Sequence, residues 1–222
     1  MAADLPHEPL ALKPVLMPIT PIPITAFTLT NALGIGVEAS LNALQTGRSG
    51  LRPSDLPGVG LETWIGRVDA IEEVELPDQL RAYDCRNNRL AYHAIQQDGL
   101  PEAIDQALSR FGAERIGVFL GTSTSGIAST EQAYISQGPE PSELASGLDM
   151  AKTHNIFSAV DLTRRLFGLA GPALSISTAC SSSAKVFAAA QRYIAAGLCD
   201  AALVGGVDSL CLTTLYGFNS LD

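Results

Sequence analysis

Short, continuously apolar runs alternate with helical patterns through the central part of the chain. Three of these runs have the length and the unbroken apolar character of strands that are covered on both faces. They span residues 116–120, 173–177 and 200–204. The helices expected around them span residues 125–136, 154–167 and 181–196. Strands that alternate with helices are typical of a mainly parallel sheet, so the pattern predicts a layered α/β fold.

The first part of the chain has a weaker pattern. Six of the thirteen prolines fall within the first 23 residues, so we expect a poorly ordered leader over 1–23 and a folded domain over 24–222. Between residues 51 and 80 the sequence predicts a long irregular connection. The regular elements expected upstream of residue 116 are strands at 24–30 and near 64–68 and helices at 37–45, 85–97 and 101–110.

Composition narrows the function classes. The chain has 222 residues, of which 46% are hydrophobic, so it can bury a sizeable core. A net charge of −9 argues against a nucleic-acid partner, because phosphate binding needs many clustered Lys and Arg residues. The sequence contains no apolar stretch as long as a membrane span and no signal-peptide pattern at its start, so we expect no membrane span and a cytoplasmic location.

Four cysteines carry the candidate chemistry. Their spacing matches neither a zinc site nor a secreted disulfide framework, so no metal is expected. Cys180 stands out because it lies between the apolar run 173–177 and the expected helix 181–196. The free N–H groups at a helix start stabilise a thiolate, which is the nucleophilic form, and a tight turn can also present an amide to an oxyanion. A buried structural thiol is the alternative, and it is the interpretation for Cys85, Cys199 and Cys211.

The residues around Cys180 carry a resemblance to a known family. The block Thr178-Ala-Cys-Ser-Ser-Ser183, with Gly168-Leu-Ala-Gly-Pro172 before it and the segment 195–208 after it, resembles the active-site block of the β-ketoacyl-acyl carrier protein synthases. The segment 115–127 resembles the strand and loop beneath their acyl pocket. The resemblance implies the amino-terminal half of a thiolase-like fold, in which 181–196 is a buried central helix.

The resemblance also implies a reaction. Cys180 would accept an acyl group from a carrier protein and would then undergo decarboxylative Claisen condensation with a malonyl thioester, without a metal or redox cofactor. Enzymes of this family carry a pair of histidines in a second half, whereas His7, His93 and His154 match no such motif. The 222-residue chain alone is therefore expected to be incomplete for condensation. The alternatives are a non-catalytic acyl-binding chain-length partner, which typically lacks the cysteine, and a truncated half that needs its complement.

Two acyl-pocket residues follow from the same resemblance. Thr124, in the loop Gly121-Thr-Ser-Thr-Ser-Gly126, matches the position of a pocket-lining side chain, and Phe218 matches another. The loop lacks the lysine of a P-loop and the spacing of a dinucleotide-binding fingerprint. The alternatives are a hydroxyl-rich loop that satisfies its own backbone and, for Phe218, an ordinary core aromatic.

Two protein partners are expected. Acyl carrier proteins are acidic, so a synthase needs a local basic patch, for which Arg81, Arg86 and Arg89 are the candidates; Arg86 and Arg89 would share one helix face. An ordinary solvated surface, with Asp84 paired to one of these arginines, is the alternative.

The apolar pattern of 203–215 also predicts a homodimer with Leu210 to Leu212 close to the interface. The alternative is that these leucines belong to the core of the chain itself.

Overall fold

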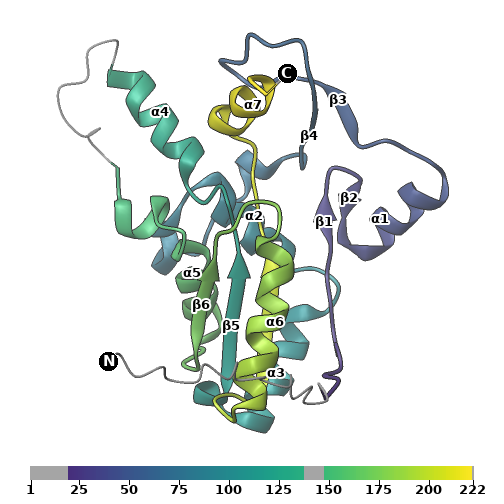
Figure 1. Ribbon diagram of the computed structural model, residues 1–222, viewed down its shortest axis with the longest axis vertical. Coiled ribbons are helices and arrows are strands. Elements are labelled where there is room, and N and C mark those ends of the chain that lie inside the picture. The colour runs from purple at the N-terminus through teal and green to yellow at the C-terminus, as the bar shows by residue number, and fades with distance from the viewer. Residues whose placement is uncertain (1–19, 138–147, 222) are drawn as a thin grey trace, which may run out of the picture.

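A three-stranded parallel sheet forms the centre of the computed structural model, which describes residues 20–137 and 148–221 (Figure 1). Its strands are β6 (Ala173–Ile176), β5 (Ile116–Gly121) and β7 (Ala201–Gly206), in the order β6-β5-β7. Val118 lies opposite both Ala173 and Leu203. Every residue of β5 is buried, which confirms the interpretation of its apolar run as a strand covered on both faces.

Helices cover both faces of this sheet. On one face, Ile116, Val118 and Leu120 pack with α2 (Arg86–Ile95), α3 (Leu100–Phe111) and α5 (Ser158–Phe167). On the other face, Phe119 packs against α6 (Ser182–Ala195) and meets the ring of Tyr193 edge to face, with 5.1 Å between the ring centroids. The result is the layered α/β architecture that the sequence predicts.

Helix α6 is buried on one side only within the described part of the chain. Val186, Ala189 and Ala190 face the sheet and are buried. Ala184 and Phe187 lie on the opposite side, where Phe187 is 50% exposed. The small side chains of this helix therefore leave an uncovered apolar face as well as a packed one.

The remaining elements surround the sheet. Two antiparallel pairs, β1 (Thr30–Asn31) with β2 (Gly34–Ile35) and β3 (Leu51–Pro53) with β4 (Trp64–Gly66), lie in the amino-terminal part. The other helices are α1 (Gly36–Gln45), α4 (Ile127–Gln137), α7 (Leu212–Asn219), the short 3₁₀ turns η1 (Ile71–Glu73), η2 (Asp78–Tyr83) and η3 (Ala113–Arg115), and a π turn, η4 (Met150–His154). Figure 1 shows α4 and α7 at the end of the molecule toward which β5 points.

The prediction of a strand over 24–30 is wrong for most of its length. Only Thr30 and Asn31 are paired, with Ile35 and Gly34. Among the described residues no strand lies beside the preceding segment, so Ile24 and Phe27 are 70% and 64% exposed. A run of β-forming residues needs a partner strand, and this run finds none here. Residues 1–19 of the expected leader lie outside the described residues, so the domain boundary at residue 24 stays a prediction.

Two helices begin later than their patterns predict. Helix α4 begins at Ile127 rather than at Ser125, because Ser125 has a positive φ of 42°, which is not helical. Helix α5 begins at Ser158 rather than at His154, because His154 closes the π turn η4.

The first turn of α6 lies directly on the ends of two strands. A Cβ atom at Gly121, the last residue of β5, would come within 2.6 Å of the Ser182 carbonyl carbon. A Cβ atom at Gly206, the last residue of β7, would come within 2.5 Å of the Ser183 Cβ. Only glycine permits this approach, so these two positions set where α6 starts.

We expect Gly121→Ala to destabilise the fold by about 1–3 kcal/mol, the usual cost of forcing a methyl group into a packed site. Denaturant unfolding followed by circular dichroism measures this change. The matched control is Gly217→Ala in α7, where no atom lies within 4 Å of the new Cβ and the stability should stay unchanged or rise slightly. Equal stabilities for the two variants would contradict the close contact at Gly121.

Candidate functional site

Cys180 lies in the turn between β6 and α6. The strand ends at Ile176, and the helix begins at Ser182, directly after Ser181. The Cys180 side chain is exposed, whereas Cys85, Cys199 and Cys211 are buried. The structure thus gives each of the four cysteines the environment that the sequence predicts for it.

The turn is closed by Ser182, the first residue of α6. Its Oγ donates to the Ala179 carbonyl (2.7 Å) and accepts from the Thr178 amide (2.9 Å), and its amide also donates to the Ala179 carbonyl (3.0 Å). Ala179 takes a left-handed conformation with a φ of 53°. A non-glycine residue rarely adopts this conformation, so the backbone immediately before Cys180 is held there by its surroundings.

A second loop, residues 122–125 after β5, lies beside this turn. Its conformation is fixed by Asp208, whose Oδ1 accepts from the Ser123 amide (2.6 Å), the Thr124 amide (3.0 Å) and the Thr124 hydroxyl (3.1 Å). The Ser123 hydroxyl in turn donates to the Ala179 carbonyl at 3.2 Å. The carboxyl ends of β5, β6 and β7 therefore meet at one hydrogen-bonded edge of the sheet.

Thr124 is buried, and its hydroxyl is already hydrogen-bonded. Besides its bond to Asp208, the hydroxyl oxygen lies 3.3 Å from Asn87 Oδ1 and accepts from the Ser209 amide at 3.0 Å. These partners come from α2 and from the segment after β7, so the Thr124 hydroxyl does not serve the backbone of its own loop, as the alternative would have it. That Thr124 lines an acyl pocket stays a prediction.

Phe218 is not brought together with Thr124. It lies on α7 and is 66% exposed. Thr124 lines a cavity of about 340 Å³ together with Asp208 and residues of β4, α2 and the segment 209–215, but Phe218 does not line it. The acyl-pocket assignment of Phe218 therefore stays a prediction that rests on resemblance alone.

Sequence reasoning missed Asn87 and Asp208 as parts of this site. Asp208 follows a short apolar strand, at the edge where the other loops of a parallel sheet gather, and this position could have indicated its role. Asn87 gives no such signal, because it reaches the loop only through the packing of α2, where its Nδ2 lies 3.3 Å from the Thr122 hydroxyl.

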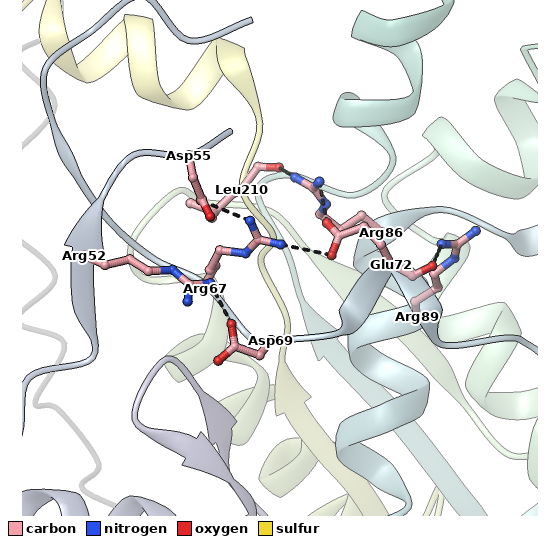
Figure 2. A network of polar contacts seen from close by, with 8 residues as sticks. All are labelled: Arg52, Asp55, Arg67, Asp69, Glu72, Arg86, Arg89 and Leu210. Atoms are coloured by element: carbon pink, nitrogen blue, oxygen red, sulfur yellow. Dashed lines mark hydrogen bonds and ion pairs between the residues drawn. The ribbon is translucent and has the colours of Figure 1, made fainter. Parts of the chain in front are cut away.

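Several side chains that line the cavity, including Arg67, Glu72 and Arg86, belong to an ion-pair network, which Figure 2 shows. Arg67 pairs with Asp55 (3.0 Å) and Glu72 (3.4 Å), and Glu72 also pairs with Arg86 (2.6 Å). Arg86 donates a further hydrogen bond to the Leu210 carbonyl at 3.1 Å. The network joins the long connection 51–80 to helix α2 and to the segment that follows β7.

Each of the three arginines of the expected carrier-protein patch is paired with an acid. Arg81 pairs with Asp78 at 2.7 Å, Arg86 pairs with Glu72, and Arg89 binds both oxygens of Asp84 at 2.5 and 2.7 Å. The hydrogen bonds that Arg89 donates to Asp84 raise the pKa of the Arg89 guanidinium.

These pairings neutralise the positive charge locally. Arg86 and Arg89 do share a helix face, since both reach Glu72, the first through its carboxylate and the second through its carbonyl. Carrier binding by the three arginines stays a prediction.

The described residues offer few other reactive arrangements. None of the His, Cys, Asp and Glu side chains described over 20–137 and 148–221 form a group of three or more that could hold a metal ion. No helix in these ranges is long and apolar enough to cross a bilayer. His154 lies 2.6 Å from the Thr130 hydroxyl through its Nδ1, and His7 lies outside the described residues.

The layered α/β fold, with an exposed cysteine at the turn into the helix that covers its sheet, is that of the thiolase-like ketosynthases, to whose solved structures it is similar. Residues 78–222 match the family model for "Beta-ketoacyl synthase, N-terminal domain". The chain therefore belongs to the β-ketoacyl synthase family, as its resemblance predicts.

Similar proteins agree with this membership. A highly reducing polyketide synthase, dmxL2, of Cryptosporiopsis sp. is 32% identical over 133 residues, which cover 59% of this chain and 5% of that protein. One chain of the solved complex of the ketosynthase ApeO with its chain length factor ApeC, from Xenorhabdus doucetiae, is 35% identical with a TM-score of 0.74 over 86% of this chain. A β-ketoacyl synthase from Burkholderia phymatum shares the fold at 20% identity and a TM-score of 0.65 over 89% of this chain.

The chain is shorter than these relatives. It spans 48% of the matched Xenorhabdus chain and 49% of the Burkholderia chain.

We expect brief treatment with iodoacetamide to label Cys180 faster than the other cysteines, by on the order of tenfold or more. Burial keeps reagents from Cys85, Cys199 and Cys211, and it raises the pKa of Cys85 and Cys199. Peptide mapping by mass spectrometry measures the four rates, and unfolding in denaturant provides the control in which all four should react. Equal rates in the folded protein, or none at Cys180, would contradict the assignment of Cys180 as the reactive thiol.

Proposed function

We propose that this chain carries the nucleophilic part of a condensing enzyme that extends acyl chains for a fatty acid or a polyketide. The observation that carries the proposal is the exposure of Cys180 at the start of α6, in a chain of the β-ketoacyl synthase family. In the first step the Cys180 thiolate attacks the thioester carbonyl of an acyl carrier protein. The carrier thiolate leaves and takes up a proton, and the acyl group remains on Cys180.

The second step forms the new carbon–carbon bond. A malonyl thioester loses carbon dioxide, and the electron pair of the broken bond becomes an enolate. The enolate carbon attacks the acyl-Cys180 thioester, and the Cys180 thiolate leaves, so the product is a β-ketoacyl thioester two carbons longer. The backbone N–H of Cys180 is the proposed donor to the oxyanion of the tetrahedral intermediate.

Decarboxylation needs groups that we do not assign to this chain. His154 is hydrogen-bonded to Thr130 at 2.6 Å, and His93 lies in the last turn of α2. We therefore propose that the paired histidines come from a complementary segment. The uncovered apolar side of α6, with Phe187 half exposed, supports this proposal, because such a face is normally buried.

A chain-length partner without catalytic activity is the competing proposal. The ketosynthase from Xenorhabdus doucetiae was solved in complex with its chain length factor, so both kinds of protein exist among the relatives. Cys180 discriminates between the two proposals, since a condensing enzyme needs the nucleophile and a chain-length partner does not. Its presence favours the enzyme.

We also propose a cytoplasmic homodimer. β7 is an edge strand of the described sheet, and an uncovered edge favours association. Leu210 and Leu212 are half-buried, and part of their surroundings lies within the same chain: Leu210 lines the cavity, and the Leu212 amide donates to Glu131 at 2.8 Å. We propose that Leu210 to Leu212 lie at the dimer interface. The competing interpretation is that these leucines belong to the core of their own chain.

The decisive test combines acyl loading and condensation. The chain, incubated with an acyl-carrier thioester, should gain the mass of one acyl group on Cys180, and Cys180→Ala should gain none. Malonyl-carrier protein should then yield no β-ketoacyl product, because positioned acid–base groups typically contribute about a hundred- to ten-thousandfold. Absence of acyl loading would favour the chain-length partner, and product formation by the chain alone would refute the need for a complementary segment.

Sedimentation velocity tests the homodimer. If Leu212 lies at the interface, Leu212→Asp should convert a dimeric parent to a monomer or render it insoluble, because the new charge would be buried without a partner. Leu221→Asp is the matched control, since Leu221 is 78% exposed and its change should leave the dimer intact. A monomeric parent would remove the homodimer, and a dimer that survives Leu212→Asp would place the interface elsewhere.

A further inference from the structure

A continuous path of hydrogen bonds connects the segment after β7 to the backbone immediately before Cys180. The path begins at Asp208, passes through Ser123 in the loop after β5, and ends at the carbonyl of Ala179. None of these three residues is itself a nucleophile or an acid–base group of the proposed reaction. Their contacts nevertheless converge on the residue that precedes the reactive thiol.

The first link fixes the position of Ser123. Asp208 Oδ1 accepts from the amides of Ser123 and Thr124 at 2.6 and 3.0 Å. Hydrogen bonds to a carboxylate are stronger than those between neutral groups, so two adjacent amides aimed at one oxygen hold this loop firmly. The exposed Ser123 side chain is thereby directed toward the turn that carries Cys180.

The second link holds the turn itself. Ser123 Oγ donates to the Ala179 carbonyl at 3.2 Å and lies 3.3 Å from the hydroxyl of Ser182. Ala179 needs such support because its φ of 53° is unfavourable for any residue with a Cβ atom. If Ala179 relaxed to an ordinary φ, the next peptide would rotate and Cys180 would move away from the first turn of α6.

We propose that Ser123 and Asp208 are positioning residues for Cys180: they hold Ala179 in its left-handed conformation and so keep the thiol at the start of α6. This inference rests on the proposed function of Cys180 as the nucleophile. Neither residue touches the substrate or the reacting atoms in this role. They act on reactivity only through the backbone of the turn.

The test is the rate at which iodoacetamide labels Cys180 in variants of the chain. Ser123→Ala and Asp208→Ala should each lower this rate by about three- to tenfold, the range that corresponds to the loss of one hydrogen bond of ordinary net strength. Ser123→Thr keeps the hydroxyl and should restore a rate within about twofold of the parent. Because both residues act along one path, the double variant should label no more slowly than the slower single variant, within about twofold.

Ser136→Ala is the matched control. Ser136 is an exposed serine of α4 whose hydroxyl donates only within its own helix, to the Gln132 carbonyl at 2.8 Å, so its loss should leave the Cys180 rate unchanged. Labelling of buried Cys85, Cys199 and Cys211 is followed in the same samples and should stay as slow as in the parent.

The outcomes separate this inference from the function on which it rests. An unreactive Cys180 in the parent would overturn the proposed function and the positioning role together. A reactive parent whose Ser123→Ala and Asp208→Ala variants label at the parental rate would overturn only the positioning role. A variant in which the three buried cysteines react as fast as Cys180 would also overturn it, since the effect would then be general unfolding.

Discussion

The close approach of α6 to the sheet is the constraint on which the rest of the site depends. Gly121 and Gly206 end β5 and β7 without side chains, and the first turn of α6 occupies the space that a Cβ would need. This contact places Ser182 where it can close the turn around Ala179. Cys180 lies in this turn, and its side chain is exposed.

Hydrogen bonds and ion pairs fix the loops around the turn that holds Cys180. Asp208 fixes the loop after β5, and Ser123 joins that loop to the turn before α6. Arg67, Glu72 and Arg86 line the same cavity as Asp208, and their ion pairs link the long connection 51–80 to this region (Figure 2). Such half-exposed ion pairs contribute little stability each, so their main effect is to fix geometry.

The sequence predicts the core elements well and the periphery poorly. The run 116–120 is identified correctly because a strand covered on both faces must be apolar throughout, whatever lies around it. The run 24–30 has equally strong strand formers, yet only Thr30 of that run is paired, because pairing depends on a partner that the local sequence does not encode. The arginines of α2 show both sides: their spacing gives the shared face and the pairing of one of them, Arg89, with nearby Asp84, but Glu72, the partner of Arg86, comes from η1.

The sequence by itself determined the family, the layered α/β class and the special place of Cys180, because strand and helix periodicities and a short motif are properties of neighbouring residues. Only the tertiary structure decided which groups surround that thiol. Ser123 and Asp208 lie far apart in the chain and meet because parallel strands bring their carboxyl ends to one edge, and Asn87 joins this region only through the packing of α2. The tertiary structure also decided that the Thr124 hydroxyl contacts Asn87, Asp208 and Ser209 and that Phe218 is exposed, because those outcomes depend on which partners the packing supplies.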